Sequence, residues 1–366
     1  MVRVALEATS ICKAVHTGIQ KYIVDLLMAL EGVAQRADDV ELTALTKQSH
    51  RMHEYRQVRG PGLRNRWYFG NGLPVAKRFD VAHVLDMRVP VIPGARYVTT
   101  VYDLAVFLEE HQFDAYSTER FRRRKRTKYQ RLFAKSDTIV AISESTKRDI
   151  VRLFDVPEDR IRVIYPGLTS RVLVKPTPDM GRAVMEKYGL TPEAYCLFVG
   201  PPNERKNADR AIDGFMKSGA SESLQLVISG HPGYTDESVR MRLENRTIAQ
   251  KVKFIGYASD DDLPALYRNA RAFLFPTLYE GFGLPILEAL ACGVPAVIGN
   301  RGAAPEVGGD YAAQVDPFSI DSIAEGIDRV LADKSFDRDA ARNWALGFDW
   351  EKSAEAYVQL YRDVAR

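Results

Sequence analysis

Two acidic residues in the second half of the chain, Glu280 and Glu288, have seven residues between them and flank a glycine-containing loop. The apolar run that ends at Phe275 predicts a buried strand before this loop. Pro285 suits the first turn of a helix, which Gly293 is well placed to close. The pattern predicts that both carboxylates lie beside the start of one helix, where they could accept hydrogen bonds from hydroxyl groups of a ligand.

The same segment favours the binding of an anion. A helix N-terminus has unpaired amides and the positive end of the helix dipole, which attract phosphate groups. Glycine lets a ligand approach the backbone closely. The residues in these positions are Gly281, Phe282, Gly283 and Leu284. The alternative is that the two carboxylates are ordinary surface groups beside a tight turn.

Short β-branched runs alternate with amphipathic stretches along the whole chain, as is typical of parallel sheets covered by helices. The runs that we expect to be strands are 2–6, 40–45, 81–85, 97–101, 138–142, 160–165, 195–199, 224–229, 252–255, 272–275 and 296–298. They predict an α/β fold with two doubly wound, Rossmann-like domains facing a cleft. Such sheets bind ligands at the carboxyl ends of their strands, so the cleft is the expected site.

The first series of strands ends at Pro166-Gly167, where we place a domain boundary. We expect a first domain over residues 1–168 and a second over 169–345. The amphipathic stretch 346–366 is expected to be a helix that packs back on the first domain.

The composition is that of a globular protein. The 366 residues are 46% hydrophobic and 27% charged, and no run is apolar enough for a signal peptide or a membrane span. We therefore expect a cytoplasmic protein. Three distant cysteines give neither a disulfide framework nor a zinc site, and the motifs of zinc proteases, serine hydrolases and P-loop enzymes are absent. Ile286 stands where a dinucleotide fingerprint starting at Gly281 needs a small residue, which argues against a nicotinamide enzyme.

The segment 275–295 with its acidic pair resembles the donor-site motif of the family 4 retaining glycosyltransferases, which have the GT-B fold. Further matching segments are 17–19, 100–104, 141–146, 198–207, 254–257, 263–267, 305–310 and 315–317. The resemblance covers nearly the whole chain, is strongest over 195–317 and is weakest over 45–80. It implies an N-terminal domain that binds the acceptor and a C-terminal domain that binds a sugar nucleotide.

By this resemblance, Glu288 binds ribose hydroxyls, Glu280 binds hydroxyls of the donor sugar, and Arg205 and Lys206 hold the diphosphate. Bond breaking puts negative charge on the leaving phosphate, which fixed cations and helix amides stabilise without a metal. We therefore expect neither a metal nor a cofactor. The alternative for the two cations is a solvated basic pair. Other residues that the resemblance places at the donor are Gly18, Gly256, Tyr257 and Leu263.

One departure from the family concerns the sugar-proximal residues. Many relatives have a histidine where this chain has Tyr102, so the role of this position is open. Tyr102 could still donate a hydrogen bond, while Asp103 either contacts the acceptor or caps a turn. Ser143, at a predicted helix start, is the third residue expected near the acceptor or the sugar.

Positive charge is concentrated in the first half. Residues 1–170 contain 28 Lys and Arg against 20 Asp and Glu, whereas residues 171–366 contain 23 against 28. Between Arg120 and Lys135 there are nine basic residues and no acidic one, interleaved with aromatic residues. A helix there could bind an anionic membrane surface or a lipid-diphosphate acceptor. A solvated face is the alternative, and nucleic acid is disfavoured because no nucleic-acid-binding module is present.

The leading interpretation is a retaining hexosyltransferase that acts on a glycan or a lipid-linked glycan, peripheral to the inner face of the cell membrane. The chain looks most like mannosyltransferases of bacterial surface polysaccharides, which makes GDP-mannose the first candidate donor and a UDP-hexose the second. The alternatives are a nucleotide-sugar epimerase or phosphorylase of the same fold, and a noncatalytic sugar-nucleotide binding protein.

Overall fold

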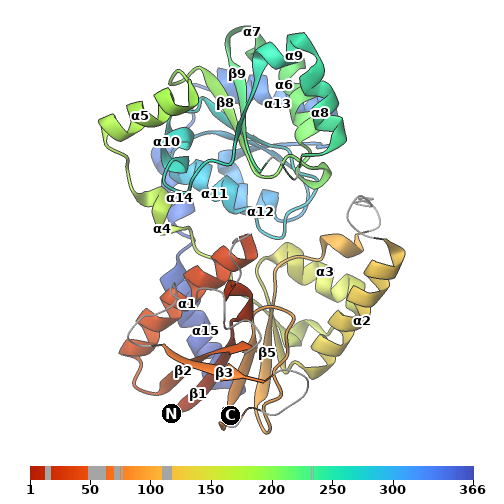
Figure 1. Ribbon diagram of the computed structural model, residues 1–366, viewed down its shortest axis with the longest axis vertical. Helices are drawn as coiled ribbons and strands as arrows, with labels where there is room; N and C mark the ends of the chain where they lie inside the picture. The colour runs from red at the N-terminus through yellow and green to blue at the C-terminus, as the bar shows by residue number, and fades with distance from the viewer. Residues whose placement is uncertain are drawn as a thin grey trace. The chain divides into compact units, whose positions relative to one another are not determined.

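The computed structural model describes residues 1–12, 18–47, 63–69, 75, 77–108, 118–231, 233 and 235–366. The chain divides into two compact units, each described here by itself (Figure 1). The first contains the described residues up to Gly167 together with Phe348–Arg366, and the second contains Leu168–Gly347. These divisions lie beside the boundaries expected after residues 168 and 345.

A parallel sheet in the order β3-β2-β1-β4-β5-β6-β7 forms the centre of the first unit. Its strands are β1 (Val2–Glu7), β2 (Val40–Lys47), β3 (Arg64–Tyr68), β4 (Val81–Val84), β5 (Arg96–Val101), β6 (Thr138–Ala141) and β7 (Ile161–Val163). Val4 of β1 pairs with Leu42 on one side and with Val81 on the other. The order of the chain therefore reverses at β1, and all carboxyl ends lie at one edge.

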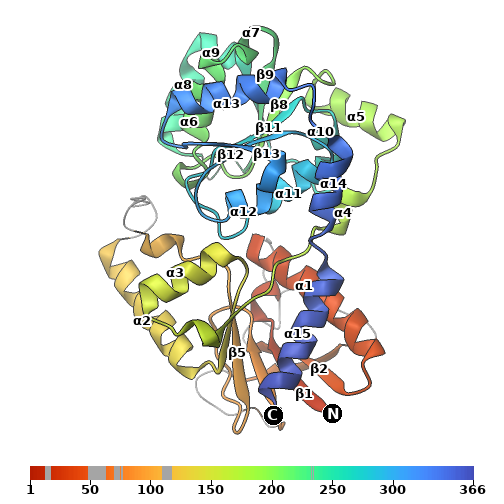
Figure 2. The same ribbon diagram turned by 180° about the vertical axis from the view of Figure 1, so that it is seen from behind.

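Four helices cover this sheet, and the last of them comes from the C-terminus. They are α1 (Gly18–Arg36), α2 (Glu119–Lys135), α3 (Glu144–Phe154) and α15 (Trp350–Val364), with 3₁₀ turns η1 (Thr9–Cys12), η4 (Ala105–Phe107) and η7 (Glu158–Arg160). α15 lies alongside α1 (Figure 2). In α1 the buried side chains include Tyr22, Ile23, Leu26, Leu27 and Leu30, the apolar face expected from their helical spacing.

A buried polar network fixes α15 to the sheet. His83 Nδ1 lies 2.7 Å from the hydroxyl of Tyr361, and Nε2 lies 2.8 Å from the hydroxyl of Thr100. The hydroxyl of Tyr357 lies 3.1 Å from Thr100 Oγ1 and 3.0 Å from the hydroxyl of Tyr22. Burial lowers the pKa of His83 to about 3, so the imidazole is neutral at physiological pH. The C-terminal helix is thus an integral part of the first unit.

The second unit has a parallel sheet in the order β10-β9-β8-β11-β12-β13. Its strands are β8 (Tyr195–Val199), β9 (Gln225–Ser229), β10 (Val252–Gly256), β11 (Ala272–Phe275), β12 (Ala296–Gly299) and β13 (Ala312–Val315). Its helices are α4 (Ser170–Leu173), α5 (Pro178–Tyr188), α6 (Ala208–Lys217), α7 (Ala220–Ser223), α8 (Glu237–Glu244), α9 (Arg246–Lys251), α10 (Leu263–Arg268), α11 (Leu284–Ala291), α12 (Ala304–Gly308), α13 (Ile320–Ala332) and α14 (Arg338–Leu346), with 3₁₀ turns η8 (Glu204–Lys206) and η10 (Gly309–Tyr311). The prediction of two doubly wound parallel sheets is confirmed.

Two strands escaped the sequence analysis, and both are edge strands. β3 has four exposed residues out of five, and its sequence begins Arg64-Asn65-Arg66. β13 is only partly buried. An edge strand needs few apolar side chains, so neither segment carries the apolar run by which the other strands were found.

Candidate active site

The second unit carries its predicted site residues at the carboxyl ends of two central strands. From β8 the chain runs outward through β9 to β10, and it then returns to the other side of β8 as β11. The loops that leave β8 and β11 therefore diverge, and this is where doubly wound sheets bind ligands. Arg205 and Lys206 follow β8, while Glu280 follows β11.

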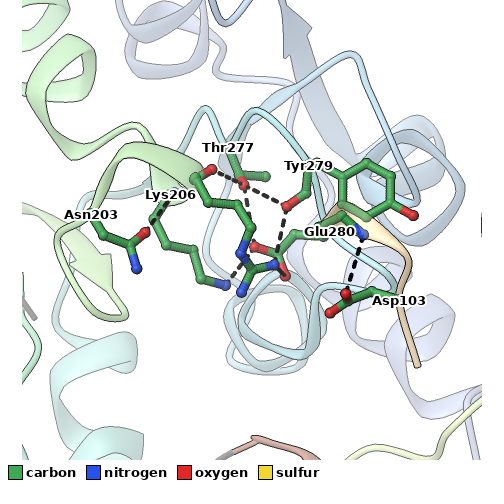
Figure 3. Close-up of polar contacts among 8 residues, drawn as sticks. Asp103, Asn203, Lys206, Thr277, Tyr279 and Glu280 are labelled. Carbon is green, nitrogen blue, oxygen red and sulfur yellow. Dashed lines mark hydrogen bonds and ion pairs between the residues drawn. The ribbon is translucent and has the colours of Figure 1, made fainter. Parts of the chain in front are cut away.

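Lys206 and Glu280 form a buried ion pair between these two loops, with their charged ends facing each other (Figure 3). Lys206 Nζ lies 2.5 Å from Glu280 Oε1, and both side chains are 9% exposed. Arg205 places Nη1 3.4 Å from Glu280 Oε2. The Lys206 ammonium also lies 4.9 Å from the centre of the Phe275 ring. The three residues expected at the catalytic centre thus lie together around one carboxylate.

The pKa of Glu280 reflects these neighbours. Burial by itself raises the pKa of a carboxyl group, because it disfavours the charged form. At Glu280 the charges of Lys206 and Arg205 and the hydrogen bonds from Lys206 and Thr277 outweigh burial, so the pKa lies below its ordinary value. Glu280 is therefore ionised at neutral pH, as an acceptor of ligand hydroxyls should be.

The 3₁₀ turn η8 presents the two cations. Asn203 Oδ1 accepts a hydrogen bond from the backbone amide of Lys206 at 3.0 Å. Asn207 has a left-handed φ of +59° and ends the turn. Its buried side-chain amide donates to the carbonyl oxygens of Pro276 at 2.8 Å and Pro317 at 2.7 Å. Asn207 therefore joins the loops after β8, β11 and β13, a role that its place in the matching segment 198–207 did not reveal.

Thr277 is a site residue that the sequence analysis missed. Its fully buried hydroxyl lies 2.9 Å from the carbonyl oxygen of Arg205 and 3.2 Å from Glu280 Oε1. A single hydroxyl proton can serve only one of these acceptors at a time. Thr277 thus connects the loop of Arg205 to the carboxylate. A threonine after a strand is too common for the sequence alone to have marked it.

The helix start after Glu280 has the predicted geometry. Gly283 has φ +107°, a conformation that L side chains rarely adopt, and it directly precedes α11. Pro285 occupies the first turn of α11, and Gly293 follows its end with φ +71°. Gly281 and Phe282 are buried, whereas Leu284 is partly buried. The loop and the helix start therefore have the backbone conformation that the two glycines and the proline predicted.

Glu288 lies within α11 and is held by Tyr267. The Tyr267 hydroxyl donates to Glu288 Oε2 at 2.8 Å. Burial, together with the nearby carboxylate, raises the pKa of Tyr267 well above its ordinary value. Of the residues expected at the donor, Gly256 and Tyr257 end and follow β10, and Tyr257 is 59% exposed. Leu263 begins α10.

In the first unit, three of the predicted residues form hydrogen bonds with backbone atoms of the same unit. The Tyr102 hydroxyl donates to the carbonyl oxygen of Leu85 at 2.7 Å. Asp103 Oδ1 accepts from the amide of Ala105 at 3.3 Å, which is the turn-capping alternative. Ser143 caps α3 by accepting from the amide of Thr146 at 3.0 Å. Gly18 begins α1, and Thr17, which precedes it in the matching segment, lies outside the described residues.

The described residues contain no group of three or more His, Cys, Asp or Glu side chains that could hold a metal ion. Among the helices described, none is both long and apolar enough to cross a membrane.

Comparison with known proteins gives the class. The family model for glycosyl transferases group 1 matches residues 182–345, and that for glycosyltransferase family 4 matches residues 17–171. The O-antigen chain mannosyltransferase B of Escherichia coli is 33% identical over 274 residues, which cover 73% of this chain and 70% of that protein. The chain therefore belongs to the family 4 glycosyltransferases.

Two further comparisons extend this result. The serotype-specific mannosyltransferase WbdA of E. coli is 29% identical over 234 residues, and the match covers 62% of this chain but only 29% of that longer protein. Sucrose-phosphate synthase from Thermosynechococcus elongatus has a similar structure, with a TM-score of 0.76 and 19% identity over 100% of this chain and 99% of that one. At that identity the structural match shows the fold alone, which is the GT-B fold.

Proposed function

We propose that this glycosyltransferase transfers mannose from GDP-mannose to a hydroxyl group of a glycan, with retention of configuration and without a metal ion. The observation that carries the proposal is the cluster of Lys206, Arg205 and Glu280 at the point where the sheet order of the second unit reverses. The names of the E. coli relatives support mannose as the sugar. A UDP-hexose is the second candidate donor.

In the proposed reaction, the bond from the anomeric carbon to the diphosphate breaks and a bond to the acceptor oxygen forms. The acceptor proton passes to the leaving phosphate, on which negative charge develops. Lys206 supplies a compact positive charge and Arg205 a planar donor for this phosphate. Glu280 accepts a hydrogen bond from a hydroxyl of the donor sugar, while Glu288 accepts hydrogen bonds from the ribose hydroxyls.

Nucleotide release tests this proposal. The full chain is incubated with GDP-mannose or with UDP-hexoses, with and without a mannose-terminated acceptor. We expect that GDP is released from GDP-mannose, that the rate of release rises when acceptor is added, and that the product is α-linked. A metal chelator should leave this rate unchanged. An epimerase would convert the donor without acceptor, and a binding protein would release no nucleotide. Either result would contradict the proposed reaction. Nucleotide release from UDP-hexoses alone would contradict GDP-mannose as the donor.

The acceptor is proposed to be lipid-linked, because α2 gives the first unit a basic surface. Its exposed basic side chains are Arg120, Arg123, Arg124, Lys128, Arg131 and Lys135. Arg126 has another task, since its guanidinium lies 5.5 Å and 5.3 Å from the ring centres of Phe107 and Phe154 and donates to the carbonyl oxygen of Leu153. Unlike Arg126, the six exposed basic side chains are available to an anionic membrane surface.

Vesicle sedimentation tests the membrane contact. We expect the wild type to bind phosphatidylglycerol vesicles at low salt, and replacement of Arg123, Arg124, Lys128 and Arg131 by Gln to abolish binding, since each charge contributes ~1 kcal/mol near such a surface. The matched control replaces four exposed basic residues of the second unit, namely Arg182, Lys217, Arg240 and Lys334. If both variants bind the vesicles equally, α2 makes no specific membrane contact and its basic side chains form a solvated face.

A further inference from the structure

The first unit has a buried acidic residue of its own, Glu7, which the mechanism above does not use. Glu7 is the last residue of β1, the strand at which the order of this sheet reverses between β2 and β4. The carboxyl end of such a strand is the ligand-binding edge of a doubly wound sheet. Glu7 is 0% exposed, so its carboxylate lies out of contact with water.

The two oxygens of this carboxylate differ in their contacts. Oε1 accepts hydrogen bonds from the amide of Thr9 at 3.2 Å, from the hydroxyl of Tyr68 at 3.1 Å, and from the hydroxyl of Thr9. Oε2 has no hydrogen-bond partner among the described residues. Buried polar atoms in native proteins nearly always have a partner. Oε2 is therefore a buried acceptor whose hydrogen-bonding capacity the described residues do not use.

A second group without a partner lies close in sequence. The hydroxyl of Ser10, in η1, is buried and likewise makes no hydrogen bond within the described part of the chain. A carboxylate oxygen that accepts and a hydroxyl that donates and accepts complement the hydroxyl groups of a sugar. A phosphate would be repelled by the carboxylate, and an apolar group would satisfy neither atom.

We propose that Glu7 binds a hydroxyl group of the acceptor sugar through Oε2, with Ser10 as a second contact. The inference rests on the proposed function, because it supplies that transfer with its acceptor site. Tyr102 and Asp103, which were expected near the acceptor, already bond to the backbone of this unit. Because Glu7 is 0% exposed, a bound sugar must displace side chains that cover Oε2.

Calorimetric titration of the full chain with methyl glycosides of mannose, glucose and galactose tests the proposal. At pH 8, where Glu7 is mostly ionised because its raised pKa is about 7, we expect saturable binding of at least one glycoside. Binding should be about ten- to a hundredfold weaker in Glu7→Gln, because a hydrogen bond to a charged group contributes that much. Ser10→Ala should lose less of the affinity for the glycosides than Glu7→Gln does. Tyr68→Phe is the matched control, because it removes a donor to Oε1 and leaves Oε2 in place.

Two outcomes would overturn the proposal. If the wild type binds none of the glycosides, or if Glu7→Gln binds them as the wild type does, Oε2 holds only water. Should Glu7→Gln fail to fold, Ser10→Ala and Tyr68→Phe decide, and equal affinity in both would count against the site. A GDP titration of the wild type tests the donor site separately, so its failure would be distinguishable from the failure of Glu7.

Discussion

Glu280 and Glu7 are both buried glutamates at the carboxyl ends of central parallel strands, yet their surroundings shift their pKa values in opposite directions. Glu280 contacts Lys206 and Arg205, and its pKa lies below the ordinary value. Among the described residues, Glu7 accepts hydrogen bonds from the neutral groups of Thr9 and Tyr68, and burial raises its pKa to about 7, although Arg88 opposes part of the rise. In each unit the sheet places a carboxyl group at the end of a strand, and the neighbours of that carboxyl group determine whether it is charged.

The largest expected effect is at the charged centre. Lys206→Gln should lower kcat about 10²–10³-fold at saturating GDP-mannose, because a charge aimed at the leaving group contributes ~3–4 kcal/mol in the transition state. It should also destabilise the fold by about 3–5 kcal/mol, since Glu280 would be left as a buried charge with a weaker partner. Lys217→Gln, at an exposed position in the same unit, is the control.

A double variant separates the two effects. Lys206→Gln with Glu280→Gln should regain most of the lost stability, because no buried charge remains, but it should not regain turnover. Steady-state kinetics and thermal unfolding of the two variants make the test. Wild-type turnover in the single variant would remove Lys206 from the mechanism.

The neutral surroundings of Glu7 predict a pH dependence of stability. The folded-state pKa of about 7 is above the ordinary value of 4.5, so the folded protein holds a proton that the unfolded chain has released. The resulting stabilisation is complete below pH 4.5 and is lost as the pH rises through 7. Relative to Glu7→Gln, the wild type should lose up to ~3 kcal/mol between pH 4.5 and 8. If the free energies of unfolding of the two proteins change equally with pH across this range, the raised pKa of Glu7 is contradicted.

The smallest expected effect concerns Glu288, whose Oε2 accepts a hydrogen bond from the Tyr267 hydroxyl. Glu288→Ala should weaken GDP binding and also cost about 1–3 kcal/mol of stability, because the buried Tyr267 hydroxyl loses its acceptor. Tyr267→Phe keeps the carboxylate and should largely preserve GDP affinity. Calorimetry with GDP compares the two, and equal losses of affinity would mean that Glu288 acts only through the fold.

The parts of the site that follow local rules could be predicted from the sequence. Gly283, Pro285 and Gly293 mark the beginning and end of α11, because left-handed glycine and first-turn proline have preferences that depend on the backbone alone. The alternation of apolar runs likewise predicted the two sheets. The resemblance to the family then directed attention to Arg205, Lys206 and Glu280, and the structure brings these three side chains together.

The remaining features depend on contacts between segments far apart in the chain. Asn207 donates to a carbonyl more than a hundred residues away, and Glu7 accepts a hydrogen bond from Tyr68, which lies 61 residues further along the chain. No local pattern records such contacts. The hydrogen bond from the Tyr102 hydroxyl to the carbonyl oxygen of Leu85 also joins positions 17 residues apart.

We propose that Glu280 recognises the donor sugar, whereas the two cations, Lys206 and Arg205, recognise the diphosphate. Calorimetry with GDP and with GDP-mannose on the wild type, on Glu280→Gln and on the exposed control Glu237→Gln tests it most directly. We predict that Glu280→Gln binds GDP nearly as the wild type does and loses the additional affinity for GDP-mannose, while the control is unchanged. Equal affinities of Glu280→Gln and the wild type for GDP-mannose, or equal losses for both ligands, would contradict the claim.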